Sequence, residues 1–444
     1  MTADVTIAPA ESAAPAPAVL PGSVRARIFL YLGVLILLLG FGAPYGGMID
    51  VPISFLLKNK LHLKAHEVAD FRLMSAIPLY AACVFGFARD TWNPFGMRDR
   101  GFMVLFGGIA SVTYVIFAFI PVSYVTLLIA VLLLTSAFLF VSSAQNGLAS
   151  TIGQQNVMSG EVSAWWNIFL GVPTLAAFFF GGILSDQLEG HNADAAIRIL
   201  FLVGAAVMGT VAVYGLLKPK SIFEHIHIER KANAHPVDDF KRLIRHWPIY
   251  PALGIWLLWN FAPGSVTPLQ YYLQDTLHAN DAQWGQWNAI FAASFTPTFL
   301  LYGVLCRRFP LRTLLFWGTV VGVPQMIPLL FIHTVGQSLV AAFFIGLMGG
   351  VASAAYFDLI IRSCPPGLQG TMLMMSWGLY YIASRFCDLL GTNLYDHFHT
   401  FTVCVISITV VYALILPVLW LVPRRLTATM DGEMPEGGYG TASG

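Results

Sequence analysis

Ionisable side chains that stand inside or at the edge of long apolar runs are the first residues of this sequence that could do chemistry. Asp50, Asp358, Arg385 and Asp388 are of this kind. A charge at the centre of a bilayer costs at least about 2.5 kcal/mol, so each is a candidate for moving protons or holding a charged solute. Burial disfavours the charged form of a carboxyl group, as a proton-coupling site requires. We therefore take Asp50, Asp388 and Asp358 as candidate proton-coupling residues.

Two pairs of opposite charges stand at helical spacing. Arg385 and Asp388 are three residues apart, so on a helix they share a face and can pair. Arg385 has a planar guanidinium that matches carboxylates, which makes it a candidate anchor for an anionic solute. A purely structural pair is the alternative. Asp358 and Arg362 are four apart near the end of another apolar run, and there we expect a gate or an anchor.

Three other charges have a specific setting. Asp50 follows Gly42-Ala-Pro-Tyr-Gly-Gly, where freed backbone groups could line a cavity, although a carboxylate that merely caps or pairs near outer water is the alternative. Arg72 either faces the cavity or extends outward along the helix to water. Glu161 begins an apolar helix, where stabilisation by the helix dipole alone explains an acid.

Uncharged polar and aromatic residues complete the candidate solute site. Five amides fall within apolar runs: Gln145, Asn146, Asn167, Asn260 and Asn288. Trp166 and Trp377 fall near matching positions of the two halves of the chain and could stack on a flat ligand. Packing inside the helices is the alternative for both, because tryptophans in the middle of a helix usually pack.

Several other kinds of chemistry lack their motifs. The five cysteines are scattered and form no CxxC pair, and the spacing of His225, His227 and His235 matches no established zinc pattern. HExxH, GxSxG, P-loop and CxxCH motifs are absent, so we expect no enzyme, no cofactor and no metal site. The net charge of +1 and the lack of a basic stripe give no indication of a nucleic-acid partner.

The elements that carry these residues are helices of membrane-spanning length. Of 444 residues, 57% are hydrophobic and 11% are charged, so the bilayer is the solvent to consider. Apolar runs long enough to cross about 30 Å of hydrocarbon predict an all-α membrane protein of twelve transmembrane helices. The predicted helices cover 27–56, 66–88, 101–121, 123–149, 160–185, 195–217, 249–273, 283–305, 313–333, 337–363, 367–390 and 400–422.

These helices predict a domain organisation. Two six-helix bundles, 25–217 and 249–425, flank a central loop, 218–248, and the Ala/Pro-rich segment 1–24 and the Gly-rich segment 426–444 are expected to be disordered tails. Most Lys and Arg residues fall in the tails, the central loop and the connections on the same side of the membrane. We therefore expect a monomer in the inner membrane with both termini and the central loop in the cytoplasm.

The two halves resemble one another in sequence. Pro52-Ile-Ser-Phe-Leu-Leu-Lys-Asn-Lys-Leu-His62 is matched by Pro268-Leu-Gln-Tyr-Tyr-Leu-Gln-Asp-Thr-Leu-His278, with proline, leucine and histidine at equal spacing. Corresponding segments run in the same direction across the membrane. This is a parallel repeat, the relation found between two transporter halves that rock against each other.

A polar loop after the second helix carries a resemblance to a known family. It reads Gly86-Phe-Ala-Arg-Asp90-Thr-Trp-Asn-Pro-Phe-Gly96-Met-Arg98-Asp-Arg100 and resembles the signature of the major facilitator superfamily. The second half has Gly303-Val-Leu-Cys-Arg307-Arg308-Phe-Pro-Leu-Arg312, without the aspartate. The resemblance implies that Asp90, Arg98, Arg100, Arg307 and Arg308 act in gating. Charges lying on anionic lipid headgroups are the alternative.

The residues around this loop are similar in particular to the folate-biopterin transporter branch, through the segment Phe55–Leu63 and Ile77-Pro-Leu-Tyr. That branch is expected to carry an acid in its fourth helix, where this chain reads Ser143-Ala-Gln-Asn146. The resemblance implies proton-coupled alternating-access transport of a small organic solute, such as a folate, a pterin or another organic anion. The alternative is a non-transporting membrane scaffold of the same fold.

Overall fold

The structure of the protein is a computed structural model, which describes residues 20–45, 53, 57, 61–63, 65–188, 193–219, 223 and 236–434. Every regular element in these ranges is a helix. Apart from their ends, helices pair their own backbone N–H and C=O groups, as a lipid environment demands. Asp50 and the three histidines at 225, 227 and 235 lie outside the described residues.

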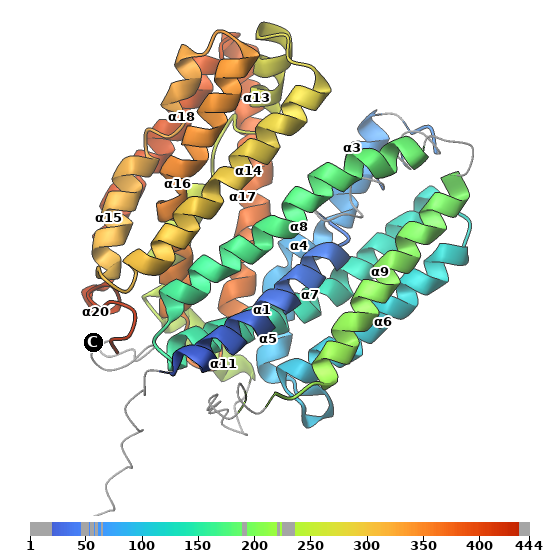
Figure 1. Ribbon diagram of the computed structural model, residues 1–444, viewed down its shortest axis with the longest axis vertical. Coiled ribbons are helices and arrows are strands. Elements are labelled where there is room, and N and C mark those ends of the chain that lie inside the picture. Colours follow the sequence, from blue (N-terminus) through green and yellow to red (C-terminus); the bar gives the residue numbers. More distant parts are fainter. Residues whose placement is uncertain are drawn as a thin grey trace, which may run out of the picture.

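Two groups of helices follow one another along the chain (Figure 1). The first group consists of α1 (Gly22–Gly42), α3 (Ala65–Ser75), α4 (Ile77–Tyr80), α5 (Ala82–Thr91), α6 (Asp99–Phe119), α7 (Tyr124–Gln155), α8 (Ser159–Leu188) and α9 (Ala193–Leu216). The second consists of α12 (Ile249–Asn260), α13 (Thr267–Tyr271), α14 (Asp281–Leu305), α15 (Leu311–Gly322), α16 (Val335–Ser363), α17 (Gln369–Phe398), α18 (Phe401–Ala413) and α19 (Ile415–Leu419).

Single turns extend these helices. They are η2 (Pro94–Gly96) before α6, η3 (Tyr272–Thr276) after α13 and η4 (Ile327–Phe331) after α15. Eight helical segments among the described residues are long and apolar enough to cross a membrane. With α3–α5, α8, α12–α13 and α17 they make twelve spans, the number predicted from the sequence.

Two predicted helices are broken at corresponding places. The sequence predicted continuous helices over 27–56 and 249–273, but α1 ends at Gly42 and α12 ends at Asn260. Pro44 and Pro263 follow these ends, and proline removes a backbone donor and pushes the preceding residue out of the helical conformation. Gly264 adopts a φ of 101°, which glycine reaches without strain. Both breaks fall at the first span of a group.

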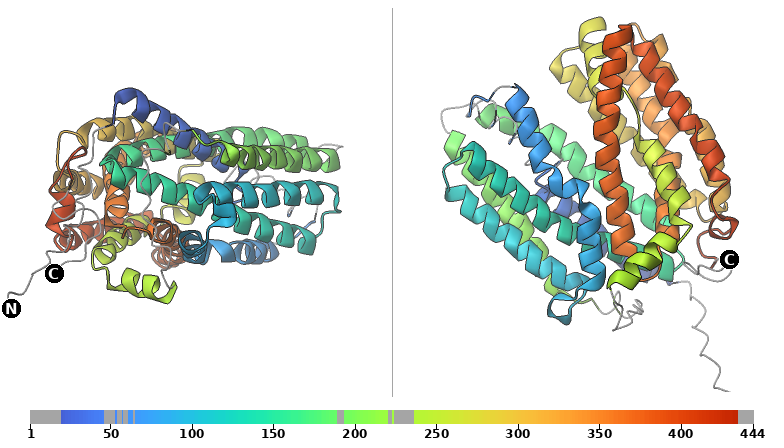
Figure 2. Two further views of the ribbon diagram at one scale, coloured as in Figure 1. Left: turned by 90° about the horizontal axis from the view of Figure 1, so that it is seen from below. Right: turned by 180° about the vertical axis from the view of Figure 1, so that it is seen from behind.

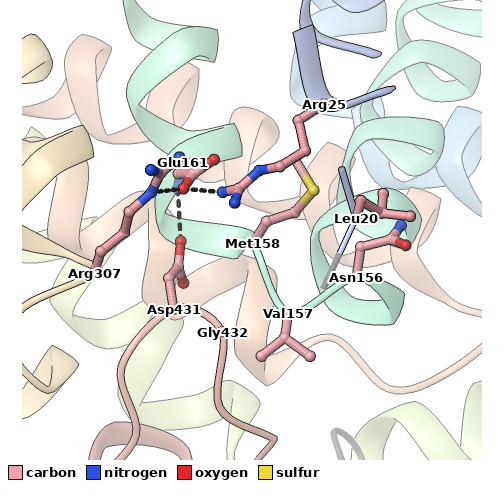
Figure 3. Close-up of a pocket in the computed structure, with 9 residues that line it drawn as sticks. All are labelled: Leu20, Arg25, Asn156, Val157, Met158, Glu161, Arg307, Asp431 and Gly432. Atoms are coloured by element: carbon pink, nitrogen blue, oxygen red, sulfur yellow. Dashed lines mark hydrogen bonds and ion pairs between the residues drawn. The ribbon is translucent and has the colours of Figure 1, made fainter. Parts of the chain in front are cut away.

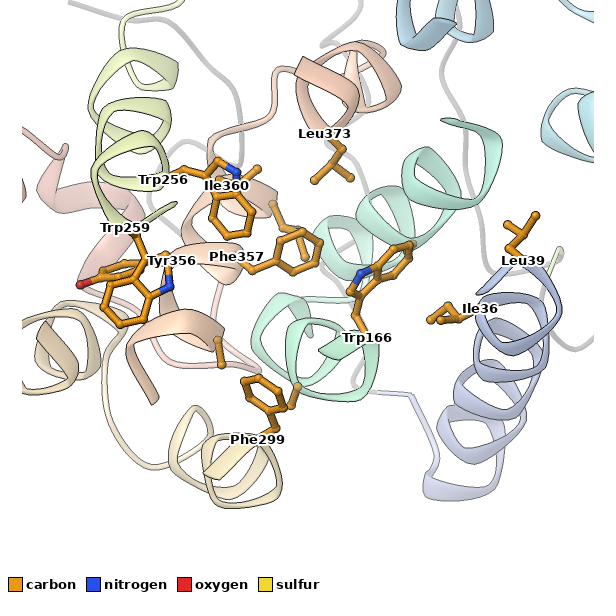
Figure 4. Packing of buried hydrophobic residues seen from close by; sticks show 14 of the residues in the cluster. Ile36, Leu39, Trp166, Trp256, Trp259, Phe299, Tyr356, Phe357, Ile360 and Leu373 are labelled. Atoms are coloured by element: carbon orange, nitrogen blue, oxygen red, sulfur yellow. The ribbon is translucent and has the colours of Figure 1, made fainter. Parts of the chain in front are cut away.

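The two groups meet at one end of the molecule and diverge towards the other, as the ribbons in Figures 1 and 2 show. They meet at the end where α1 begins and α20 (Arg424–Thr427) lies, which we call the termini side. Aromatic side chains pack across the contact (Figure 4). The ring centroid of Phe357 on α16 lies 5.8 Å from that of Trp166 on α8 and 6.0 Å from that of Trp256 on α12.

Two segments predicted to be irregular are ordered. The predicted central loop contains α11 (Pro236–Arg245), an amphipathic helix. The predicted disordered tail from residue 426 is instead packed against the helices as far as the described residues extend: Leu426 and Thr427 are buried, and the backbone N–H of Asp431 bonds to the carbonyl of Cys306 at 2.9 Å. The composition of the segment did not predict this packing, because few of its residues make the contact.

Candidate functional site

The first part of the site is a cluster of charges on the termini side, where α1, α8 and α14 meet (Figure 3). Glu161, in the first turn of α8, pairs with Arg25 of α1 and with Arg307, which follows α14. Only 2% of the Glu161 side chain is exposed. The expectation that the helix dipole alone accounts for this acid is therefore wrong, because the residue joins the two groups of helices through two arginines.

Asp431 of the C-terminal segment adds a second carboxylate to this cluster. It accepts hydrogen bonds from the backbone N–H groups of Gly160 at 3.1 Å and Glu161 at 2.9 Å, which have no partner within the first turn of α8. It also pairs with Arg362 of α16, with the nitrogen and oxygen 2.9 Å apart. Burial and the nearby charge of Asp358 raise the pKa of Asp431 to about 7. The C-terminal segment thus holds α8 to α16.

Asp358 and Arg362 form the ion pair predicted from their spacing, at 2.9 Å. Both are buried, with at most 1% of either side chain exposed. The hydroxyl of Tyr302 donates to Asp358 at 2.8 Å, and Arg362 also donates to Ser159 of the first group at 3.0 Å. Arg362 pairs with both Asp358 and Asp431, so the Asp358–Arg362 pair belongs to the same contact between the groups.

A second contact on the termini side involves the signature loop. The carboxylate of Asp90 accepts from the backbone N–H of Gly370 at 3.2 Å and from the N–H and hydroxyl of Thr371 at 2.6 and 2.7 Å. These N–H groups open α17, so an acid of the first group caps a helix of the second. Arg89 holds Asp90 in place through an ion pair of 2.7 Å. A Cβ atom at Gly86 would collide with the carbonyl of Gly370, so only glycine permits this approach.

The other basic residues of the loop behave differently. Arg100 donates to the carbonyls of Gly215, Leu216 and Leu217 at the end of α9, at 3.0, 2.7 and 3.1 Å, and so joins two neighbouring helices of one group. Arg98 and Arg308 are exposed. Of the five predicted gating residues, Asp90 and Arg307 are the ones that the structure brings across the contact. Gln154, which the sequence did not single out, crosses as well, donating to the carbonyls of Ile361 and Cys364 at 2.8 Å each.

The second part of the site lies where the two groups begin to diverge. Arg385 of α17 donates to the hydroxyl of Tyr45, just after α1, at 2.6 Å. The guanidinium of Arg72 on α3 lies 5.8 Å from the centre of the same tyrosine ring, within reach of a cation–π contact. The ring of Tyr381 meets Tyr45 edge-on at 6.1 Å. Two cations from different groups of helices thus contact the same tyrosine, one at its hydroxyl and one at its ring.

Asp388 does not pair with Arg385 as the spacing allowed. It accepts from the backbone N–H of Thr267 at 3.1 Å and from the Thr267 hydroxyl at 2.9 Å, at the start of α13. The break after α12 leaves these N–H groups without partners in their own helix, and the carboxylate satisfies one of them. The prediction of an Arg385–Asp388 pair is therefore wrong, and Arg385 faces Tyr45 instead.

The predicted amides divide into two sets. Asn167, Asn260 and Asn288 each donate to a carbonyl four residues earlier on their own helix, at 2.8, 2.8 and 2.9 Å. Gln145 and Asn146 are buried on α7. The amide of Asn146 reaches Ser142 at 3.1 Å and the sulfur of Met374 on α17 at 3.5 Å, while its oxygen and the Gln145 nitrogen bond to none of the described residues.

The two predicted tryptophans also differ. Trp166 is buried in the aromatic contact of Figure 4, and its ring N–H has no partner among the described residues. Trp377 is half-buried and meets Trp256 edge-on at 6.5 Å. Buried polar groups are nearly always hydrogen-bonded, so the open positions on Gln145, Asn146 and Trp166 are places where water or a solute can bind.

Comparison with known proteins identifies the family of the chain. A model of the Major Facilitator Superfamily matches residues 155–386, which is more than half of the chain. The chain belongs to this superfamily. The folate-biopterin transporter of Synechocystis sp. is 22% identical over 366 residues, covering 78% of this chain and 71% of that protein. The sequence-based resemblance to a superfamily transporter near the folate-biopterin branch is thereby confirmed.

Solved structures of the superfamily have the same fold. The transporter FucP in its outward conformation matches with a TM-score of 0.68 at 13% identity, covering 90% of this chain and 99% of that one. The proton:xylose symporter XylE, bound to 6-bromo-6-deoxy-D-glucose, matches with a TM-score of 0.67 at 12% identity, covering 92% and 98%. These likenesses concern the fold, and they agree with twelve helices. Membership of the superfamily identifies the protein as a transporter rather than an enzyme.

Proposed function

We propose that the protein is a secondary transporter that moves a small organic solute by alternating access, with protons as the coupling ion. The observation that carries the proposal is the one-sided contact between the two groups of helices. Ion pairs and helix caps join the groups on the termini side. The Arg385–Tyr45 hydrogen bond, with Arg72 beside it, lies where the groups begin to diverge. Alternating access requires such an arrangement, with one side held shut and the other open.

The distribution of basic residues supports a cytoplasmic position for both termini in the inner membrane, as predicted. The conformation described is then open towards the outside and shut towards the cytoplasm. To open inwards, Glu161 must release Arg307, Asp431 must release α8 or Arg362, and Asp90 must release the start of α17. Water replaces each of these polar contacts once they are exposed, so the two states can be close in free energy.

The solute class follows from the residues around Tyr45. Two guanidinium groups attract an anion, and tyrosine and tryptophan rings provide flat apolar surfaces for an organic ring. We infer an organic anion with a flat ring system, for which a pterin or a folate is the first choice because the Synechocystis relative is named a folate-biopterin transporter. Gln145, Asn146 and Trp377 are the proposed polar and stacking partners deeper in the same region.

The proton-coupling proposal rests on the carboxylates that remain. Asp388 is engaged by Thr267, and Asp50 lies outside the described residues. Asp358 and Asp431 share Arg362, and the pKa of Asp431 is raised to about 7 by its burial and by Asp358. A proton taken up by this pair of acids would change the strength of the contact that closes the cytoplasmic side.

The test is uptake into proteoliposomes that contain the purified protein. Pterins, folates and other flat organic anions are offered with and without an imposed pH gradient, and a protonophore removes the gradient. We expect gradient-driven uptake of at least one of these solutes. Replacing Arg385→Gln should raise its KM at least tenfold because a charge-assisted contact with the solute is lost. Arg312→Gln, at an exposed arginine on the termini side, is the matched control.

Absence of uptake for every solute, with the protein correctly folded, would refute the transport proposal. If the protein also retained a stable membrane-protein partner through purification in mild detergent, the scaffold alternative would take its place. Uptake without any dependence on the gradient would refute only the proton coupling.

A further inference from the structure

The amphipathic helix α11 places basic residues beside a hollow on the termini side. A cavity of about 500 Å³ lies between α11 and the turn formed by Pro365 and Pro366, which connects α16 to α17. Lys241, Arg242 and Arg245 line it together with one acid, Asp238. The charge of this lining is therefore positive. It lies outside the charge clusters that join the two groups of helices.

The cavity is held in shape by its own contacts. Arg242 donates to the carbonyl of Pro366 at 2.8 Å and pairs with Asp239 at 3.4 Å, so α11 is tied to the turn that forms the opposite wall. Leu243 packs into the main hydrophobic core and anchors the helix from behind. Lys241 and Arg245 remain to face a ligand.

A buried polar atom marks the cavity as a site for a ligand. His246 lines it with only 3% of the residue exposed, and its Nε2 atom has no partner among the described residues. Burial and the nearby charges of Arg425 and Arg242 lower the pKa of His246, so its ring is neutral at pH 7. The backbone of Ser363 already accepts a hydrogen bond from the ring, so Nε2 can donate only when the ring is protonated, and an anion bound beside it favours that form. Buried polar groups rarely lack a partner, and in this basic cavity an anion that holds the protonated ring supplies one.

The surroundings place this cavity at the depth of lipid headgroups. Phe240, Ile244 and Trp247 are large apolar residues that are 53%, 50% and 59% exposed. Trp247 and Tyr250 flank the start of α12, and tryptophan and tyrosine at the end of a membrane-spanning helix lie at the interface with water. A basic amphipathic helix in this position binds anionic membranes through both its apolar and its charged residues.

We propose that the cavity between α11 and the Pro365–Pro366 turn binds the phosphate group of an anionic phospholipid headgroup. Lys241 and Arg245 supply the positive charge, His246 supplies a hydrogen bond, and Phe240, Ile244 and Trp247 lie against the acyl chains nearby. The bound headgroup ties α11 to the connection between Arg362 and Thr371, two residues of the contacts that close the termini side.

The experiment measures lipid retained by the full-length protein in detergent by native mass spectrometry. Phosphatidylglycerol, phosphatidylcholine and inorganic phosphate are titrated separately. We expect bound phosphatidylglycerol at concentrations where phosphatidylcholine does not bind. The double variant Lys241→Gln/Arg245→Gln should weaken phosphatidylglycerol binding about 25-fold, since each cation near the membrane surface contributes about fivefold. Arg312→Gln should leave it unchanged.

Equal binding of phosphatidylcholine and phosphatidylglycerol would overturn the proposal, and so would unchanged phosphatidylglycerol binding in the double variant. Inorganic phosphate that displaces the lipid at similar concentrations would show a site for a soluble anion and overturn it as well. The melting temperature of the double variant in detergent should equal that of the unchanged protein, because Arg242 and Leu243, which hold the helix, are retained. The outcome is independent of whether the protein transports a solute.

Discussion

The substitution Asp431→Ala should weaken the contact between the C-terminal segment and the helices on the termini side by a measurable amount. The carboxylate accepts two backbone N–H groups of α8 and one N–H of Arg362, and all three lose their acceptor. Three such bonds contribute about 4 kcal/mol in total. Burying the ionised carboxylate has a desolvation cost, and removing this cost offsets about half of the 4 kcal/mol. The net loss is about 2 kcal/mol, or about 30-fold in the population of the released segment.

Cys306 reports this release directly. It is a free cysteine with 1% of its surface exposed, and its carbonyl accepts the backbone N–H of Asp431 at 2.9 Å. We expect its alkylation by a water-soluble maleimide at pH 8, followed by mass spectrometry, to be about 30-fold faster in Asp431→Ala. Cys404, buried within the second group at α18, is the internal reference and should not change.

The matched control is Glu433→Ala, which removes an exposed acid of the same segment. Among the described residues its carboxylate accepts only from the backbone N–H of Met430. This variant should alkylate at the rate of the unchanged protein. An unchanged rate at Cys306 in Asp431→Ala would refute the reasoning that this carboxylate holds the segment. An equal increase at Cys404 would instead indicate general unfolding.

Three further predictions concern the same regions. The pKa of Asp431 is raised to about 7 when the segment is docked, so docking should be strongest below about pH 4 and weaken as the pH rises to about 7. Hydrogen exchange at residues 428–434, corrected for intrinsic rates, should therefore become faster over this pH range in the unchanged protein. The exchange should not change with pH in Asp431→Asn. A Cβ atom at Gly86 collides with the start of α17, so Gly86→Ala should keep the termini side open and increase the distance between spin labels placed across it, whereas Gly108→Ala, which meets open space, should not. Arg385→Lys keeps the charge but loses the planar fork, so solute uptake should show a KM between those of the unchanged protein and Arg385→Gln.

The sequence predicted the twelve spans because hydropathy over about 20 residues depends on local composition alone. The Asp358–Arg362 pair was predictable for a similar reason, since the two residues share a helix. The Arg385–Asp388 pair had equally good spacing, but the break after α12 left the N–H of Thr267 in need of an acceptor, and Asp388 met it. Local spacing shows which contacts are possible, and the tertiary structure selects among them.

The contacts between the two groups were harder to predict. Glu161 looked like an ordinary helix-terminal acid because its partners, Arg25 and Arg307, are more than 130 residues away in either direction. Asp431 stands in a polar Gly-rich segment whose composition is typical of disorder, and its role depends on three bonds. The break at Pro44 was visible as a Gly/Pro stretch, and its helix-ending effect could have been inferred from the proline alone.

The position of Asp431 after the last of the twelve spans has a consequence for biosynthesis. Proteins are made from the N-terminus, so all twelve spans have been synthesised before this residue is added. Glu161 and Arg362 are therefore already made while the acid that connects them is still missing. Synthesis that stops shortly before residue 431 would yield a chain that contains every span but lacks the carboxylate that ties α8 to α16 on the termini side.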